Sequence, residues 1–74
     1  MGILVHLDQL LLDRQMTLTE LSQQVGISLK NLSLLKQGKV RAMRFSTLAA
    51  ICEVLQCQPG DLLSYQPEKA AYSS

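Results

Sequence analysis

The amino-acid sequence predicts an all-α fold, a compact domain of five short helices. The chain has 74 residues, which is enough for one domain with a small core. Apolar residues recur three or four positions apart, as on the inner face of a helix, and no stretch alternates like a half-buried strand. Capping residues and glycines divide this pattern into short segments, so a bundle of short helices is expected.

The first helix is predicted at about residues 3–14 and the second at about 18–25. The first rests on four leucines at helical spacing, Leu4, Leu7, Leu10 and Leu11. The second begins at a Thr-x-x-Glu capping box, Thr17 and Glu20, in which each side chain bonds to the other residue's backbone N–H. Gly26 is expected to end the second helix in a left-handed backbone conformation.

The third helix is predicted at about residues 29–37. Ser28 is a good N-cap residue and Gly38 follows the last turn. Leu32 and Leu35 lie three positions apart and form its inner face.

A basic loop at 39–45 precedes a fourth helix at about 47–55, capped by Ser46. The inner face of the fourth helix has four residues, Leu48, Ile51, Cys52 and Leu55. Pro59 fits the first turn of a fifth helix, where its missing N–H has no cost, and Leu62 and Leu63 close the core. The domain is therefore expected at 1–65, with 66–74 as a disordered tail.

Positive charge is concentrated in one part of the chain. The formal net charge is only +1, yet the segment from Leu21 to Cys52 contains no acidic residue. Its basic residues are Lys30, Lys36, Lys39, Arg41 and Arg44. A polyanion responds to such a local concentration of charge rather than to net charge, so the pattern favours binding to nucleic acid.

Residues 17–37 have the order helix, short glycine turn, helix, which is typical of a helix-turn-helix unit with its second helix in the DNA major groove. The outward side of that second helix is predicted to be polar, with Ser28, Lys30, Asn31 and Ser33. Asn can pair with adenine and Lys can donate to guanine, so these side chains suit base readout.

Other chemistries find little support in the sequence. His6 is the only histidine, and Cys52 and Cys57 are five positions apart, longer than the Cys-x-x-Cys spacing of redox or zinc sites. No serine–histidine–acid set and no glycine-rich phosphate loop can be assembled. We therefore expect no enzyme, no metal and no cofactor, and the N-terminus, which lacks a secretion or membrane signal, favours the cytoplasm.

The order of the parts resembles the Cro/C1-type, or XRE-like, helix-turn-helix family over about residues 3–65. The stretches that carry the resemblance are MTLTELSQQVGIS, NLSLLKQGK and FSTLAAICEVLQCQPGDLL. The last of these, with LKQGKVRAMRFSTL, is similar to a subfamily of small bacterial and phage regulators. The resemblance implies a lambda-repressor-like DNA-binding domain that acts as a transcriptional regulator, with repression as the expected mode.

The resemblance also implies roles for individual positions. Thr17 matches the start of the second helix, where backbone N–H groups meet a phosphate. Positions that face base edges are Ser28, Leu29 and Lys30, followed one turn later by Ser33 and Leu34. Positions on the loop that follows the phosphate backbone are Lys39, Arg41 and Arg44. Arg44, just before the expected core residue Phe45, also has the reach for the minor groove.

Two positions depart from the family pattern. Leu29 and Leu34 are apolar where many members have polar groups, so they contact a thymine methyl or face a protein partner. Lys36 stands where many members carry an acid paired with a base on the first helix. We expect that ion pair to be absent and Lys36 to be free for a phosphate.

The apolar content exceeds what a core this small can hold. The surplus side chains are Ile3, Val5, Leu12, Leu18, Leu29 and Leu34. Such surplus favours a homodimer, on a face that the sequence does not specify. The alternative function is a protein-interaction module, such as an antitoxin-like or adaptor protein that grips its partner with Leu29 and Leu34. Such a module would not need the basic loop.

Overall fold

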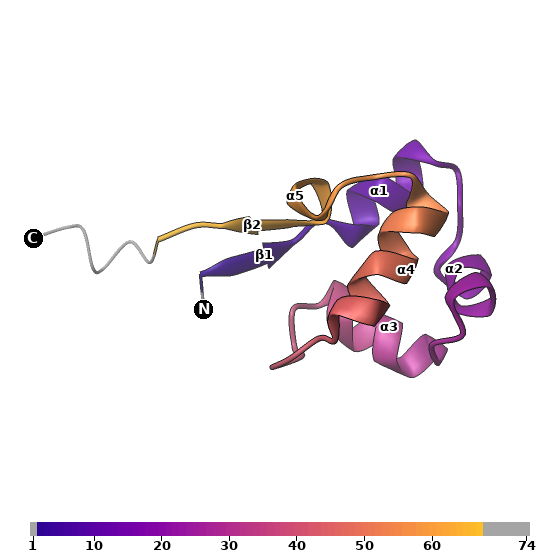
Figure 1. Cartoon of the computed structure of the whole chain (residues 1–74), viewed down its shortest axis with the longest axis horizontal. Helices are drawn as coiled ribbons and strands as arrows, with labels where there is room; N and C mark the ends of the chain where they lie inside the picture. The colour runs from indigo at the N-terminus through magenta and orange to yellow at the C-terminus, as the bar shows by residue number, and fades with distance from the viewer. Residues whose placement is uncertain (1, 68–74) are drawn as a thin grey trace, which may run out of the picture.

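The computed structural model describes residues 2–67. Five helices form the body of the molecule, and a two-stranded sheet projects from one end of it (Figure 1). The elements in chain order are β1 (Ile3–Val5), α1 (Leu7–Asp13), α2 (Leu18–Val25), α3 (Leu29–Lys36), α4 (Phe45–Leu55), α5 (Pro59–Leu62) and β2 (Leu63–Tyr65). The five predicted helices are therefore present, whereas the term all-α holds only for the body. None of the described helices is long and apolar enough to cross a membrane.

The core is made of aliphatic side chains from all five helices. The buried residues are Leu7, Leu10, Leu11, Leu21, Leu32, Leu35, Ile51, Leu55 and Leu62. Within the described residues no polar or charged side chain is buried. The helix α4 runs through the middle of the body and contacts both α2 and α5 (Figure 1). Burial of these side chains is what holds α2 and α3 in place.

The N-terminal segment differs from the prediction, because residues 3–5 form a strand rather than the first turn of a helix. The strand β1 pairs antiparallel with β2, and Ile3, Leu4 and Val5 lie opposite Tyr65, Ser64 and Leu63. The β-branched Ile3 and Val5 suit an extended backbone. Their partner strand lies almost a full chain length away, so local periodicity gives no sign of it. Leu4, predicted to face the core, is exposed at the edge of the sheet.

The helix α2 has the predicted bounds, and both of its predicted ends are confirmed. The Thr17 Oγ1 accepts from the Glu20 N–H at 3.1 Å, and the Thr17 N–H donates to Glu20 Oε1 at 2.9 Å. Gly26 ends the helix with φ +72°, a conformation that a side chain disfavours. The Ser22 hydroxyl then donates to the Ile27 carbonyl at 2.5 Å and fastens the turn between α2 and α3.

The helix α4 begins two residues earlier than predicted. Its N-cap is Arg44, whose side chain makes no capping hydrogen bond, and Ser46 lies within the first turn. Phe45, predicted to be a core residue, is 86% exposed. The first position of α4 points outward, whereas Ile51 and Leu55 further along the same helix are buried in the core.

The C-terminal part follows the prediction at Pro59, which occupies the first turn of α5. Leu62 is fully buried, whereas Leu63 is half-buried and opens β2. Of the predicted tail, Gln66 and Pro67 are described, and the Gln66 N–H extends the ladder by donating to the Gly2 carbonyl at 2.6 Å. Residues 68–74 lie outside the described part of the chain.

Candidate nucleic-acid interface

The helix α3 is anchored on one side and open on the other. Leu32 and Leu35 are buried against the core, and the residues about half a turn away from them face outward. This outward surface is formed by Lys30, Ser33, Leu34 and Gln37, of which Lys30 and Gln37 are exposed and the other two half-buried. Three of the predicted base-facing residues therefore share one surface.

Gln37, at the C-cap of α3, belongs to the same surface, although it is not among the predicted site residues. Its amide Nε2 donates to the Ser33 Oγ at 3.2 Å, so the two side chains lie one above the other on adjacent turns. The sequence contains the signal for this, because Gln37 follows Ser33 by four positions and Lys30 by seven.

The start of α3 has a different arrangement. The Ser28 hydroxyl is exposed and accepts from the Asn31 N–H at 3.1 Å, which confirms it as the N-cap. Leu29 is exposed on one flank of the helix. Asn31 is exposed on the opposite flank, beside the loop that follows α3. The predicted base-facing residues thus occupy an outward surface and two flanks rather than one face.

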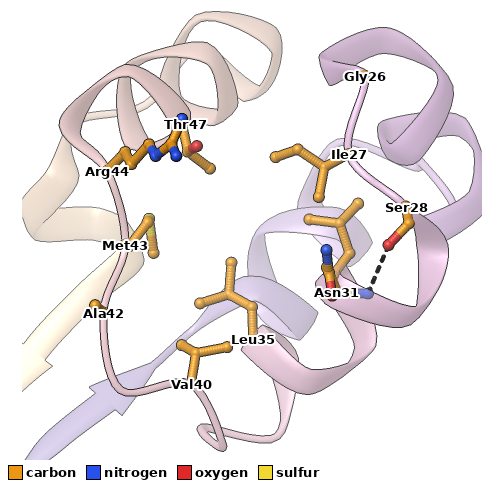
Figure 2. A pocket seen from close by; sticks show the side chains of 11 residues that line it. Gly26, Ile27, Ser28, Asn31, Leu35, Val40, Ala42, Met43, Arg44 and Thr47 are labelled. Carbon is orange, nitrogen blue, oxygen red and sulfur yellow. Dashed lines mark hydrogen bonds between the residues drawn. The ribbon is translucent and has the colours of Figure 1, made fainter.

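A groove of about 480 Å³ separates α3 from that loop and from the start of α4. Its floor is apolar and includes Leu32, Leu35 and Val40, while Asn31 and Arg44 stand on opposite sides of it. Figure 2 shows Asn31 rising from α3 and Arg44 from the opposite wall. The loop therefore runs back along α3, which brings the cationic side chain of Arg44 to the groove beside the helix.

The predicted loop cations Lys39, Arg41 and Arg44 are all exposed. Within residues 2–67 the single ion pair joins Lys36 and Asp8, so these three side chains and Lys30 make none there. Four cations with unsatisfied charge therefore lie on or beside α3, in a segment that contains no acid. Such an arrangement attracts a polyanion.

The prediction that Lys36 is free for a phosphate is wrong. Its Nζ lies 3.5 Å from Asp8 Oδ1, so α3 and α1 are joined by an ion pair whose polarity is the reverse of the family pattern, with the cation on α3 and the acid on α1. The packing of α1 turns Asp8 toward α3, although both side chains remain exposed enough to keep solvent contact.

Thr17 is exposed at the N-terminus of α2, as predicted. Its hydroxyl both accepts from the Glu20 N–H and donates to Glu20 Oε1, so the side chain is occupied by the capping box. The backbone N–H groups of Leu18 and Thr19 belong to the first turn and have no helical partner.

The remaining chemistry-bearing residues do not gather into a site. Among residues 2–67, no three His, Cys, Asp or Glu side chains are placed to hold a metal ion. His6 Nε2 lies 2.7 Å from the Ser64 Oγ and ties α1 to β2. Cys52 and Cys57 are free and half-buried, and burial together with the neighbouring Cys52 raises the pKa of the Cys57 thiol.

A capped helix, a left-handed glycine turn and an exposed second helix beside a cationic loop define a helix-turn-helix domain. The family model of the Cro/C1-type HTH DNA-binding domain matches residues 6–68. The chain therefore belongs to the Cro/C1-type helix-turn-helix DNA-binding family. The predicted class, a helix-turn-helix DNA-binding transcriptional regulator, is thereby confirmed.

Two known proteins illustrate the relationship. An uncharacterized HTH-type transcriptional regulator, YozG of Bacillus subtilis (strain 168), is 52% identical over 69 residues, which cover 93% of this chain and 82% of that protein. The crystal structure of the transcriptional regulator VanUg superimposes with a TM-score of 0.73 at 37% identity. That comparison covers 90% of this chain and 88% of VanUg.

Proposed function

We propose that the chain is a homodimeric repressor that works by occupancy, binding a specific duplex DNA site and excluding other proteins from it. The observation that carries the proposal is the open surface of α3 beside the exposed cations Lys39, Arg41 and Arg44. The mechanism needs no catalytic step, metal or cofactor, and its place is the cytoplasm, where bacterial DNA is found. The two half-sites would lie about 34 Å apart, one turn of DNA.

Base readout is assigned to the surface and flanks of α3. Lys30 donates to guanine, and Ser33 and Gln37 supply a hydroxyl and an amide on the same outward surface. Asn31 reads an adenine from the flank that faces the groove. Leu29 and Leu34 contribute apolar contact to thymine methyl groups rather than hydrogen bonds, and Ser28 fixes the start of the helix.

Phosphate contacts are assigned to both sides of α3. The N–H groups at the start of α2, next to Thr17, meet one phosphate, and Lys39, Arg41 and Arg44 meet others. Lys36 adds a contact when it leaves Asp8, because an exposed pair gives only a small stabilisation. For four to five neutralised phosphates, the logarithm of the binding constant should fall with the logarithm of salt concentration with a slope of about −4.

The test is to select bound sequences from a random duplex pool and then to measure affinity for the selected site and for scrambled DNA over a salt series. Arg44→Ala should weaken both affinities alike and make the salt slope less negative by about one. Asn31→Ala should relax discrimination at one base pair, at a cost of about 1–3 kcal/mol for the selected site. Glu53→Gln, a change at an exposed position on α4, is the control. It should leave the affinities for the selected site and for scrambled DNA, and the discrimination between them, close to those of the wild type.

Two results would count against this function. One is equal affinity of the wild type and Arg44→Ala at every salt concentration. The other is a tight, salt-insensitive complex with a co-expressed protein and no shift of DNA, which would favour the alternative of a protein-interaction module. The exposure of Leu29 keeps that alternative open, and Leu29→Ala separates the two because it would abolish protein capture while leaving non-specific DNA affinity unchanged.

A further inference from the structure

The strand β1 has one edge without a partner among the described residues. The ladder between the strands includes the His6 N–H donating to the Leu62 carbonyl at 2.7 Å and the Gln66 N–H donating to the Gly2 carbonyl at 2.6 Å. Hydrogen-bonded and non-hydrogen-bonded residue pairs alternate along an antiparallel ladder. The backbone N–H and C=O of Leu4, which lies opposite Ser64, therefore also point toward β2. The N–H and C=O groups of Ile3 and Val5 therefore point away from β2.

This edge has no charge or proline to oppose pairing. Natural edge strands are blunted by short length, charged side chains, prolines or bulges, and of these β1 has the short length of three residues. Residues 2–7 contain none of the four charged residue types and no proline, and the opposing residues 62–66 are equally uncharged. The two strands also expose large apolar side chains, with Ile3 51%, Leu4 40% and Tyr65 68% exposed.

The other edge of the sheet is less accessible. The helix α5 contacts β2 and lies along its outer side near the body, whereas β1 lies on the opposite side of the ribbon (Figure 1). An isolated two-stranded ribbon is only marginally stable in water, and further strands stabilise it. The geometry thus favours an additional strand beside β1.

We propose that two copies of the chain pair antiparallel through β1, which gives a four-stranded sheet with the order β2, β1, β1, β2. The inference rests on the proposed homodimer and assigns its interface. The two-fold axis passes beside Leu4. Ile3 of each copy then exchanges two backbone hydrogen bonds with Val5 of the other, which satisfies the outward groups of both strands.

A second copy is the occupant because the edge is complementary to itself. In an isologous interface the same groups meet across the two-fold axis, so a charged edge would repel its own copy. The β1 edge has no such charge, whereas the basic segment at Lys39, Arg41 and Arg44 would repel itself. Pairing through β1 therefore joins two copies and leaves α3 of each open to DNA.

The first test uses the close approach of the two Leu4 residues. They form a non-hydrogen-bonded pair, with Cα atoms about 4.5 Å apart, a distance that a disulfide spans. Leu4→Cys is made in a chain that also carries Cys52→Ala and Cys57→Ala, and it is oxidised with copper phenanthroline without DNA. It should form a covalent dimer in high yield. Leu12→Cys in the same background, at a position that is 72% exposed on α1, should give no covalent dimer.

The second test removes a hydrogen bond of the edge without touching the ladder. Ile3→Pro deletes an outward N–H, so the fold should persist while the dimer dissociates at least tenfold more readily in sedimentation. Leu4→Pro deletes an inward N–H and should disrupt the ribbon itself, as seen by circular dichroism. A fully monomeric wild type would overturn both the homodimer and this interface. If the wild type is a dimer, Ile3→Pro leaves it intact and Leu4→Cys gives no cross-link, the interface alone is overturned. The affinity for a single DNA half-site tests the DNA-binding proposal separately.

Discussion

The Nε of Arg14 donates a hydrogen bond to the backbone carbonyl of Leu55 at 2.7 Å, and its Nη2 donates to the Gln56 carbonyl at 3.1 Å. Leu55 is the last residue of α4, and the final carbonyls of a helix have no partner within it. The guanidinium also lies at the negative end of the helix dipole. Arg14 therefore fixes the end of α1 to the end of α4 and acts as a structural cation.

Replacement of Arg14 should weaken the fold and leave the DNA contacts in place. Arg14→Ala is expected to lower the free energy of unfolding by about 1–2 kcal/mol, because two charge-assisted hydrogen bonds are lost at a partly exposed site. Arg14→Lys keeps the charge without the forked geometry, so its free energy of unfolding should lie between those of the wild type and Arg14→Ala. Urea denaturation measures both, and an unchanged midpoint for Arg14→Ala would refute the structural role.

The Asp8–Lys36 pair should contribute little to stability. Both side chains are exposed, so a double-mutant cycle with Asp8→Asn and Lys36→Gln should give a coupling energy of about 0.2–1 kcal/mol. Asp8→Asn has a second expected effect, since it frees Lys36 for a phosphate. Affinity for non-specific duplex at low salt should rise, and in the Lys36→Gln background Asp8→Asn should raise it less.

The parts that sequence predicted well are those encoded by local signals. Thr17 with Glu20, and Ser28 with the N–H of Asn31, each lie within four residues, and so the starts of α2 and α3 follow directly from the chain. The outward position of Lys30 follows from helical periodicity around Leu32.

The parts that sequence missed depend on distant packing. The pairing of β1 with β2 joins segments about 60 residues apart, and no local pattern indicates it. The Lys36–Asp8 pair depends on how α1 is rotated against α3. Phe45 is expected in the core from the family resemblance, but the start of α4 turns it outward.

Leu55 and Phe45 differ widely in solvent exposure along α4, so together they test which side chains form the core. Leu55 is fully buried and Phe45 is 86% exposed. Leu55→Ala should cost about 2–5 kcal/mol through lost burial and the cavity that remains. Phe45→Ala should change the free energy of unfolding by less than about 0.5 kcal/mol, despite the larger side chain removed. A loss of several kcal/mol for Phe45→Ala in thermal or urea unfolding would show that this ring is packed.

Glycine is required at the turn of the helix-turn-helix but not in α5. Gly26 has φ +72°, so Gly26→Ala should cost about 1–2 kcal/mol, although a Cβ there would meet no atom within 4 Å. Gly60 also has open space around it, and its backbone is helical. Gly60→Ala is therefore expected to be neutral or to stabilise by about 0.4–1 kcal/mol. Equal effects of the two substitutions on the unfolding midpoint would contradict the backbone argument.

The Cys57 thiol should become reactive only at higher pH than an ordinary cysteine. Burial is the main cause of its raised pKa, and the adjacent Cys52 and Asp61 act in the same direction. The folded state thus holds the thiol proton more firmly than the unfolded chain does. The resulting stability is present below about pH 8.5 and is lost as pH rises through the pKa of the folded thiol.

Alkylation by iodoacetamide across a pH series measures this shift directly. In Cys52→Ala the reaction of Cys57 should still require a higher pH than a short cysteine peptide, because the burial persists after the neighbouring thiol is removed. The rise in the pKa of Cys57 should be smaller in Cys52→Ala than in the wild type. In the wild type, digestion and mass spectrometry distinguish alkylation of Cys52 from alkylation of Cys57. A Cys57 profile that coincides with the peptide in both proteins would mean that α4 and the start of α5 open too readily to shield the thiol.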